Sequence, residues 1–499
     1  MEVRVNIIFI YFEKNIKLLY ICSWKQSNKY NMKNTANHFK TVVCAVLFSV
    51  LPLGNVWADE LIRYDSHDIY ACSESIIRNY APGVDVVCVH DRSVSAGHPF
   101  FLAVKDTSNV SYYMVMGILD TVYDFEILKD TVYFCGKYSS SIYSGCAVVG
   151  YFDILSLMSS GYTTVSYLPI TSMKTLSKLE VEFFASWKHL VAIGTDNLDS
   201  AVVMDATEGP TGWNICCAIF GNDSLRLTDI AFTDDYIVIT STKRASGMAP
   251  ISGYRNRVLW WIEKTVMGPY YVPFNNVRRY IFDDGCKSYM VRARKDNEFV
   301  TVCNFMSPAT QPCDYNISVY DGLNMISSYK FTESGNSMVS SGLLDISVDR
   351  TPGGKRLCVL LNNAYGNTAD KSVIYDIPLL PTFFPTIIGG HVNNYNVNVR
   401  SLDYTGINGH FVASGIGPGL YYDHPYFLKY KFDNYDGDCF ERVENELIDD
   451  SRPNQPTEKK VEKSIEQIIP VMDEIDKKEL EITEKCNSST DSDGEREKE

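Results

Sequence analysis

The most reactive side chains in this sequence are acidic residues that recur at matching places in a repeated pattern. Asp124, Glu182, Asp229 and Asp345 each lie where apolar and polar residues alternate. Two carboxylates that face each other across a cleft could serve as the acid and base of a glycoside hydrolase. Recurrence favours a structural role instead, in which each carboxylate accepts hydrogen bonds from the backbone of the neighbouring repeat. The sequence therefore identifies no catalytic residue.

The sequence contains none of the common motifs for metal, phosphate or nucleophilic chemistry. Its histidines are scattered, and no Cys-x-x-Cys, nucleophile-elbow, zinc-protease or Walker motif occurs. The run DNYDGD (433–438) is similar to a calcium-binding loop, but Tyr435 and Gly437 stand where that loop needs acidic ligands. An ordinary acidic turn is the favoured interpretation. We expect no metal and no cofactor.

Two pairs of cysteines occupy equivalent places in different repeats. Cys135 and Cys146 flank a loop of about ten residues, and Cys303 and Cys313 flank a similar loop. A disulfide that closed either loop would stabilise the fold by roughly 2–3 kcal/mol. Buried thiols that pack as small apolar groups are an equally good interpretation.

Basic and aromatic residues gather in and beside the two longest insertions, residues 241–257 and 268–280. Aromatic and arginine side chains are common anchors of binding surfaces. The alternative is a solvated loop beside ordinary core aromatics. The candidate binding residues are Arg244, Tyr254, Arg255, Arg257, Trp260, Trp261, Tyr270 and Tyr271.

The elements that would position these residues are strands in a repeat of 48–60 residues. Most repeats have an alternating strand, a turn rich in Asp, Asn or Gly, a fully apolar strand, and a third strand that often ends in an acid. Residues 123–136, 181–194 and 228–241 align without a gap over the first two strands. The third strands lie at 100–106, 148–154, 201–207, 257–263, 317–323, 372–378 and 426–433.

Alternation indicates a strand with two unlike faces, whereas a continuous apolar run indicates a strand buried on both faces between stacked sheets. The period is close to that of a β-propeller blade, about 40–50 residues. Over residues 61–440 the chain resembles secreted bacterial β-propeller repeat proteins, and without a WD or kelch signature the resemblance implies no activity. We predict an all-β propeller of about seven four-stranded blades, in which residues 61–66 could complete the last blade. Six blades, or two β-sandwich domains, are the alternatives.

Residues 32–58 have the features of a signal peptide. Two lysines precede the apolar run Thr41–Leu53, and Val56 and Ala58 supply small residues before a cleavage point. A membrane anchor is the alternative, although the run is short for a span. We expect an exported protein, located in the periplasm, outside the cell or at its surface. The mature chain is expected to have no transmembrane span.

The segment before the predicted signal needs a separate explanation. Residues 1–31 are rich in Ile, Asn, Lys, Tyr and Phe, which is typical of translated AT-rich non-coding DNA. We predict that Met32 is the true start and that these residues are a start-site error.

Charge is unevenly distributed along the chain. Residues 59–440 carry a net charge of −11 without a basic cluster, which argues against nucleic acid as a partner. Residues 441–499 carry −9 and contain no aromatic residue. Such a segment cannot bury enough apolar surface to fold alone. We predict an acidic tail that is disordered or partly helical.

These observations favour an exported module that binds or scaffolds a protein, peptide or glycan, and the balance is against catalysis. The alternative is a carbohydrate-active hydrolase or lyase with carboxylates at the propeller channel. Unrepeated acids that converge in a deep pocket would favour the enzyme. A channel lined by equivalent residues of each blade would favour binding.

Cleavage after Ala58 predicts the N-terminus of the mature protein. N-terminal sequencing of exported protein is expected to give Asp59, whichever methionine starts translation. A mature chain beginning near Met1 would contradict both the signal peptide and the start at Met32.

Overall fold

The computed structural model divides the chain into two compact units, Met1–Val56 and Trp57–Glu499. In the first unit, β1 (Arg4–Phe12) and β2 (Asn15–Ser23) form an antiparallel hairpin. The predicted signal peptide and its cleavage point lie outside the described residues. The structure describes residues 4–12, 15–23, 60–63, 72–91, 99–105, 110–115, 119–138, 145–160, 163–185, 187–209, 212–221, 224–244, 255–267, 270–274, 276–305, 314–332, 342–349, 356–362, 372–379, 387–393, 397–406, 410–418, 423–431, 440–449, 457–460, 467–468, 478–480 and 485–487.

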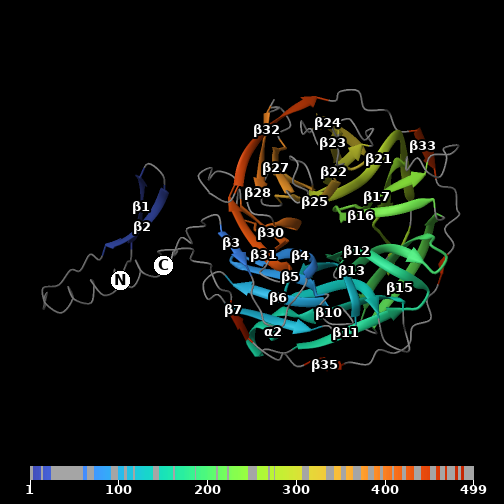
Figure 1. Cartoon of the computed structure of the whole chain (residues 1–499), viewed down its shortest axis with the longest axis horizontal. Coiled ribbons are helices and arrows are strands. Elements are labelled where there is room, and N and C mark those ends of the chain that lie inside the picture. The colour runs from blue at the N-terminus through green and yellow to red at the C-terminus, as the bar shows by residue number, and fades with distance from the viewer. Residues whose placement is uncertain are drawn as a thin grey trace, which may run out of the picture. The chain divides into compact units, whose positions relative to one another are not determined.

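The second unit is built from antiparallel sheets in which four strands follow one another across the sheet (Figure 1). The first sheet contains β4 (Cys72–Ala81), β5 (Val84–Asp91), β6 (Pro99–Lys105) and β7 (Val110–Val115). The second contains β8 (Leu119–Leu128), β9 (Thr131–Tyr138), β10 (Ala147–Asp153) and β11 (Thr163–Ile170), with helix α2 (Ile154–Ser160) before β11. The third contains β12 (Met173–Phe184), β13 (Trp187–Asp196), β14 (Ala201–Gly209) and β15 (Gly212–Gly221).

The later sheets repeat this pattern. The fourth sheet contains β16 (Leu225–Phe232), β17 (Tyr236–Arg244), β18 (Arg255–Glu263) and the first half of β21 (Val277–Lys295), after a small hairpin of β19 (Thr265–Met267) and β20 (Tyr270–Val272). The fifth contains the second half of β21, β22 (Glu298–Phe305), β23 (Asp314–Asp321) and β24 (Asn324–Thr332). The sixth contains β25 (Gly342–Val348), β26 (Arg356–Asn362), β27 (Ser372–Pro378) and β28 (Ile387–Asn393).

The last sheet joins the two ends of the repeat region. It contains β29 (Asn398–Tyr404), β30 (His410–Pro418), β31 (Asp423–Lys431) and β3 (Glu60–Arg63), which comes from the start of the unit. The expectation that the segment beginning at Leu61 completes the last sheet is thus confirmed for the described residues 61–63. The predicted all-β class is also confirmed, because nearly all described elements are antiparallel strands.

The first strands of successive sheets contact one another in a closed series. β4 contacts β8, and the series continues through β12, β16, β21, β25 and β29 back to β4. Figure 1 shows β4, β12, β16 and β25 of this series around a common centre. Apolar core clusters fill the spaces between neighbouring sheets, including one that joins Val412 and Phe427 of the last sheet to Val87 and Phe100 of the first.

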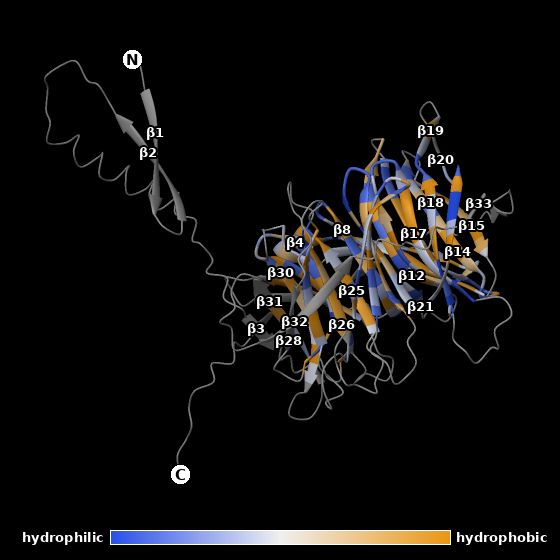
Figure 2. Ribbon diagram, turned by 90° about the horizontal axis from the view of Figure 1, so that it is seen from above, coloured by the Kyte–Doolittle hydropathy of each residue, from blue (hydrophilic) through white to orange (hydrophobic). Residues whose placement is uncertain are grey.

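The apolar pattern explains this packing. The second strands, such as β9 and β26, are buried along most of their length because a sheet covers each face. Figure 2 shows the hydrophobic residues that run along the strands of these sheets. Each large apolar side chain removed from water contributes about 1.5–3 kcal/mol, so the closed series of sheets is held mainly by the interfaces between them.

The tail differs from the sequence prediction. Its described segments are strands: β32 (Phe440–Asp449) pairs with β24 and β28, and shorter strands pair with the outer strands of other sheets. Outer strands leave backbone N–H and C=O groups unpaired, and an extended chain can satisfy them. The prediction of a disordered or partly helical tail is therefore not confirmed for the described segments. The shorter strands are β33 (Thr457–Lys460), β34 (Gln467–Ile468), β35 (Lys478–Leu480) and β36 (Lys485–Asn487).

Glycines opposite the first strands permit close approach of two backbones. A Cβ at Gly136 would clash with the backbone oxygen of Thr121, and one at Gly194 would clash with that of Thr175. We expect Gly136→Ala and Gly194→Ala each to lower the free energy of unfolding by about 2–3 kcal/mol, measured by urea denaturation.

Gly342→Ala is the matched control, because a Cβ there would meet no atom within 4 Å. Its effect is expected to stay within about 0.5 kcal/mol. Equal stability of all three variants would contradict the close approach.

Candidate functional site

A bulge interrupts each first strand, and in five of the sheets it places one residue at the same structural position. The register shifts by one residue immediately before each of these positions. Bulges re-aim side chains and strengthen local twist. These five residues form what we call the axial ring, which consists of Asp124, Lys178, Asp229, Asp345 and Ser401. In the first and fifth sheets the bulge precedes Glu74 and Ser288, and the hydrogen bonds between sheets place Ile76 and Met290 at the equivalent positions.

Three axial aspartates join their sheet to the next through the backbone. Asp124 Oδ2 accepts the N–H of Leu179 at 3.4 Å, and Asp229 Oδ2 accepts that of Val291 at 3.0 Å. Asp345 Oδ2 accepts the N–H of Leu402 at 3.1 Å. This is the structural role expected from their recurrence in the sequence.

Glu182 does not share that role, because the gapless alignment of its repeat is wrong. Gly194 and Gly136 are equivalent, but the β12–β13 hairpin extends further beyond them than β8–β9 does. Lys178 therefore occupies the position of Asp124, and Glu182 lies nearer the turn. Strand length, which the apolar pattern alone does not define, caused the error.

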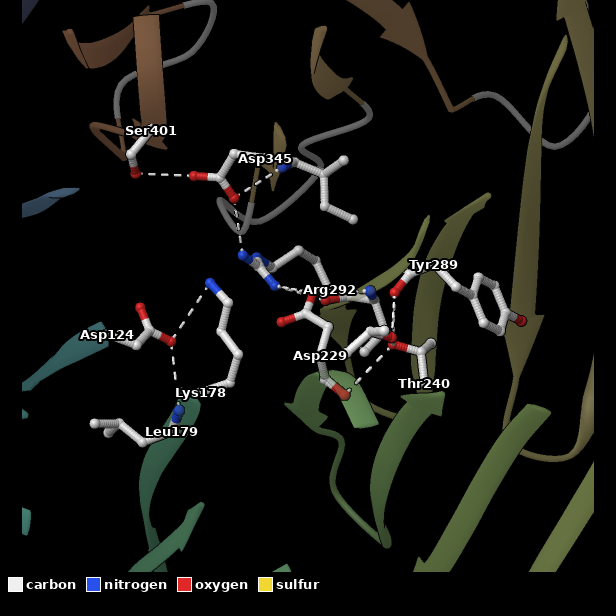
Figure 3. A network of polar contacts seen from close by, with 12 residues as sticks. Asp124, Lys178, Leu179, Asp229, Thr240, Tyr289, Arg292, Asp345 and Ser401 are labelled. Atoms are coloured by element: carbon white, nitrogen blue, oxygen red, sulfur yellow. Dashed lines mark hydrogen bonds and ion pairs between the residues drawn. The ribbon is translucent and has the colours of Figure 1, made fainter. Parts of the chain in front are cut away.

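Arg292 bridges two axial carboxylates (Figure 3), and Arg78 binds two acids of the neighbouring strand β8. Arg292 donates to Asp229 at 2.5 Å and to Asp345 at 3.0 Å, which lie on the sheets before and after its own. Arg78 donates to Asp124 at 2.8 Å and to Glu126 at 2.7 Å. Every side chain here is largely removed from water, so these pairs are the buried kind whose rupture is costly.

Sequence reasoning did not identify these arginines. Both occupy the same place in their hairpins, since Arg78 lies opposite Val86 and Arg292 opposite Val300. Each guanidinium also donates to the carbonyl of the residue before it, Ile77 in one case. The sequence did contain a signal for them. In both repeats an apolar residue followed by Arg stands at the same distance before a valine-rich strand.

The electrostatic environment shifts the pKa values of Asp229 and Asp345 in opposite directions. Burial would raise the pKa of Asp345, but Arg292, Lys178 and Arg78 hold it below the ordinary value. Burial dominates at Asp229 and raises its pKa, although Arg292 and Lys178 oppose that rise. Burial would lower the pKa of Arg292, and the surrounding carboxylates raise it above the ordinary value. Arg292 therefore remains charged between two acids of unequal strength.

A polar cavity of about 100 Å³ lies beside this network. Asp403 on its wall accepts the backbone N–H of Asn79 at 2.9 Å and the hydroxyl of Ser347 at 3.2 Å. Arg78, Glu126 and Arg292 also line it, and all three are engaged in the ion pairs above. Among the described residues, no group of His, Cys, Asp and Glu is arranged to hold a metal ion.

A second buried charge network surrounds His189. Its Nε2 lies 2.9 Å from Asp205 Oδ1, its Nδ1 lies 3.4 Å from Glu182 Oε1, and its ring stacks on Phe232. Lys264 donates to Glu182 at 2.9 Å. Burial alone would lower the pKa of His189, but the two carboxylates raise it to about 9.

Three predicted binding residues do not reach the surface, and this corrects the sequence prediction. Trp260 and Trp261 are buried on opposite faces of the fourth sheet, in two different interfaces between sheets. Arg257 is also buried, with its guanidinium over the ring of Phe282 and a hydrogen bond to Asn316. These residues lie in a strand that is buried between two other sheets, so their side chains pack in the core although their types are common in binding surfaces.

The other predicted binding residues lie at opposite ends of β18. Arg244 and Arg255 are at the end near residue 255, whereas the β19–β20 hairpin follows Glu263. A strand of nine residues is roughly 27 Å long, so the two insertions do not form one surface. Tyr270 and Tyr271 are placed in β20 by their backbone, and Tyr254 lies outside the described residues.

Three arginines gather where β16, β17 and β18 meet, and we call them the arginine cluster. Arg244 lies directly opposite Arg255, and Arg226 lies opposite Thr242, on the same face of the sheet. Arg226 and Arg244 are exposed, and Arg255 is half-buried. Within the described part of the chain, none of the three forms an ion pair. Burial and the two neighbouring arginines lower the pKa of Arg255.

The Cys135–Cys146 disulfide that the sequence allowed is not formed. Cys135 lies opposite Val149, whereas the backbone N–H of Tyr138 bonds to the carbonyl of Cys146. The two cysteines of this pair are therefore about three positions, or roughly 10 Å, apart along the strands. Cys146 and Cys135 are both buried thiols. The Cys303–Cys313 pair cannot be placed in full, because Cys313 lies outside the described residues; Cys303 contacts a different cysteine.

Comparisons with known proteins give similarity in fold only. No protein-family model matches the chain, and no curated protein matches it in sequence. Drosophila plexin A, in a complex with semaphorin 1b, is 6% identical, covers 74% of this chain and 88% of its own, and has a TM-score of 0.39. No helix among the described residues is long and apolar enough to cross a membrane.

Two other solved structures similar to this chain are propeller-like proteins. A neuraminidase-like protein of subtype N10 from a bat influenza virus is 8% identical, over 75% of this chain and 99% of its own, with a TM-score of 0.35. A Trypanosoma rangeli sialidase, in a complex with the inhibitor DANA, is 8% identical, over 74% of this chain and 58% of its own, with a TM-score of 0.33. At these scores we infer no function from any of them.

Loss of the Arg292 side chain is expected to destabilise the folded protein. Arg292→Met would leave Asp229 and Asp345 buried without their shared cation, which should lower the free energy of unfolding by about 3–5 kcal/mol. Lys174→Met removes an exposed pair with Asp199, whose side chain is 60% exposed, and should cost less than about 1 kcal/mol. Equal losses in chemical denaturation would show that the axial pairs carry no special stability.

The His189 network predicts a stability that falls in alkaline solution. The pKa of His189 is about 9 in the folded chain and about 6.5 when unfolded, so its contribution is complete below pH 6.5 and lost as the pH rises through 9. On the order of 3 kcal/mol is expected to disappear over that window. The measurement is the difference in unfolding free energy between the native chain and His189→Gln. A difference that stayed constant with pH would contradict the shift.

Proposed function

We propose that residues 59–440 form a seven-bladed β-propeller in which each four-stranded sheet is one blade. The closed series of contacts between first strands supports this count, as does the apolar core between the last sheet and the first. Two β-sandwiches would instead bury separate cores, each between one pair of sheets. The pairing of β3 with β31 joins the ends of the ring.

The propeller acts as a binding or scaffold module. The main support for this proposal is that its axial carboxylates are engaged in contacts between blades. Asp124, Asp229 and Asp345 each accept a backbone N–H of the next blade and pair with a cation. A general acid or base must exchange a proton with substrate, and carboxylates committed to blade contacts are poorly suited to that task. The five residues of the axial ring occupy equivalent positions in their blades, and this repetition favours binding over catalysis.

The arginine cluster is the binding surface that the geometry favours. Like charges directly opposite each other on antiparallel strands destabilise a sheet, yet Arg244 and Arg255 occupy such a pair. A bound anion would remove this repulsion and satisfy the guanidinium donors. The partner is therefore a protein, peptide or glycan that presents carboxylate or sulfate groups, and it is met outside the cytoplasm after export through residues 32–58.

Binding to the arginine cluster is tested with a sulfated polysaccharide such as heparin and with poly-glutamate as probes. Arg244→Gln is expected to weaken binding to at least one probe about tenfold, while its thermal stability is unchanged or slightly raised because the Arg244–Arg255 repulsion is relieved. Binding should also weaken as salt is added. Calorimetric titration and thermal unfolding provide the two measurements.

The matched control is Lys330→Gln, which removes an exposed cation paired with Asp314 at 2.6 Å. It should leave binding unchanged. Equal loss in both variants, or no binding to either probe, would overturn the assignment to the arginine cluster. Cleavage of a glycan that was lost in Glu126→Gln would favour the alternative, a carbohydrate-active enzyme that acts at the axis.

A further inference from the structure

Two cysteine sulfurs that the sequence prediction did not pair are in direct contact. Cys286 begins the second half of β21, and Cys303 lies on the adjacent strand β22. Their Sγ atoms are 2.9 Å apart, and both side chains are completely buried in the core between the fourth and fifth sheets. The separation exceeds a covalent S–S bond by only about 0.9 Å.

A bulge brings these sulfurs together. Cys303 lies opposite Tyr289, and the register shifts between Cys286 and Ser288. In a regular sheet the resulting diagonal pair would have Cα atoms roughly 7–8 Å apart, at or beyond the limit for a disulfide. The extra residue twists the strand, and the observed contact between the sulfurs is the result.

We propose that Cys286 and Cys303 form a disulfide when the chain folds in an oxidising compartment. The thiols lose two protons and two electrons, and the disulfide of glutathione or of a thiol oxidoreductase accepts them and becomes two thiols. The exchange takes place during folding, because both sulfurs are inaccessible in the finished core. This site is independent of the arginine cluster.

The position of the pair gives the bond a structural task. β21 pairs with β18 as far as Gly285 and with β22 from Cys286 onward, so one strand leaves the fourth sheet and enters the fifth at this point. A bond from Cys286 to β22 holds the strand at that change of partner. In the reduced chain, the Cys303 thiol donates to Cys286 Sγ, and the Cys286 thiol donates to the Ser288 carbonyl at 3.0 Å.

Other pairings compete less well among the described cysteines. Cys135 and Cys146 are offset along their strands, and Cys216 and Cys217 are neighbours whose side chains project to opposite faces of β15. Cys303 was expected from the sequence to pair with Cys313. A bond to Cys286 and a bond to Cys313 are mutually exclusive, so peptide mapping separates them.

The experiment refolds the full chain from denaturant in a buffer of reduced and oxidised glutathione. Unreacted thiols are then alkylated in denaturant, and peptides are mapped by mass spectrometry without reduction. We expect a cross-linked pair of peptides that contain Cys286 and Cys303. We also expect protein refolded in the presence of reductant to have a lower melting temperature than protein refolded in glutathione. The proposal would be overturned if both cysteines of protein refolded in glutathione were found alkylated, or if Cys303 were found linked to Cys313.

Variants show whether the change in melting temperature belongs to this pair. Cys303→Ala should abolish the effect of reductant, and Cys286→Ala is the second choice if that variant does not fold. Cys358→Ala is the matched control, since Cys358 is also a buried cysteine on a second strand. It should retain both the cross-linked peptides and the effect of reductant. Loss of the effect in the Cys358 variant alone would contradict the pairing.

Discussion

The axial ion pairs are the interaction on which the rest of this structure depends. The first strands bring charged residues to one region, and in five sheets a bulge lies immediately before the residue that faces it. Asp229 and Asp345 are nearly removed from water there, and Arg292 compensates for their burial from the strand between them. The fourth, fifth and sixth sheets therefore depend on one another for charge balance as well as for apolar contact, because an unpaired buried charge costs several kcal/mol.

The buried carboxylates at the axis have a structural role, and the proposed binding surface lies elsewhere in the molecule. The acids that first suggested glycoside chemistry are engaged in holding sheets together, and the cavity beside them is lined by groups that already have partners. The arginine cluster is the reverse case, because its charges are adjacent and have no counter-ion among the described residues. A fold maintains such repulsion at a cost to stability, and the association with an anionic partner would offset it.

The boundary between the fourth and fifth sheets concentrates several of these features. β21 belongs to both sheets, Arg292 reaches from it toward both neighbours, and Cys286 and Cys303 meet beside its bulge. Trp261 fills the same interface. The contact between the two sulfurs, the ion pairs of Arg292 and the apolar contacts all hold a strand that has no turn between its two pairings.

The sequence by itself determined the all-β class, the strand repeat and the structural use of Asp124, Asp229 and Asp345. These follow from local periodicity, which depends on how a strand's two faces are buried. Tertiary structure alone decided the place of Glu182, the burial of Trp260 and Arg257, the bridging arginines and the contact between Cys286 and Cys303. Those depend on hairpin length, bulges and register between strands distant in sequence, which composition and spacing do not encode.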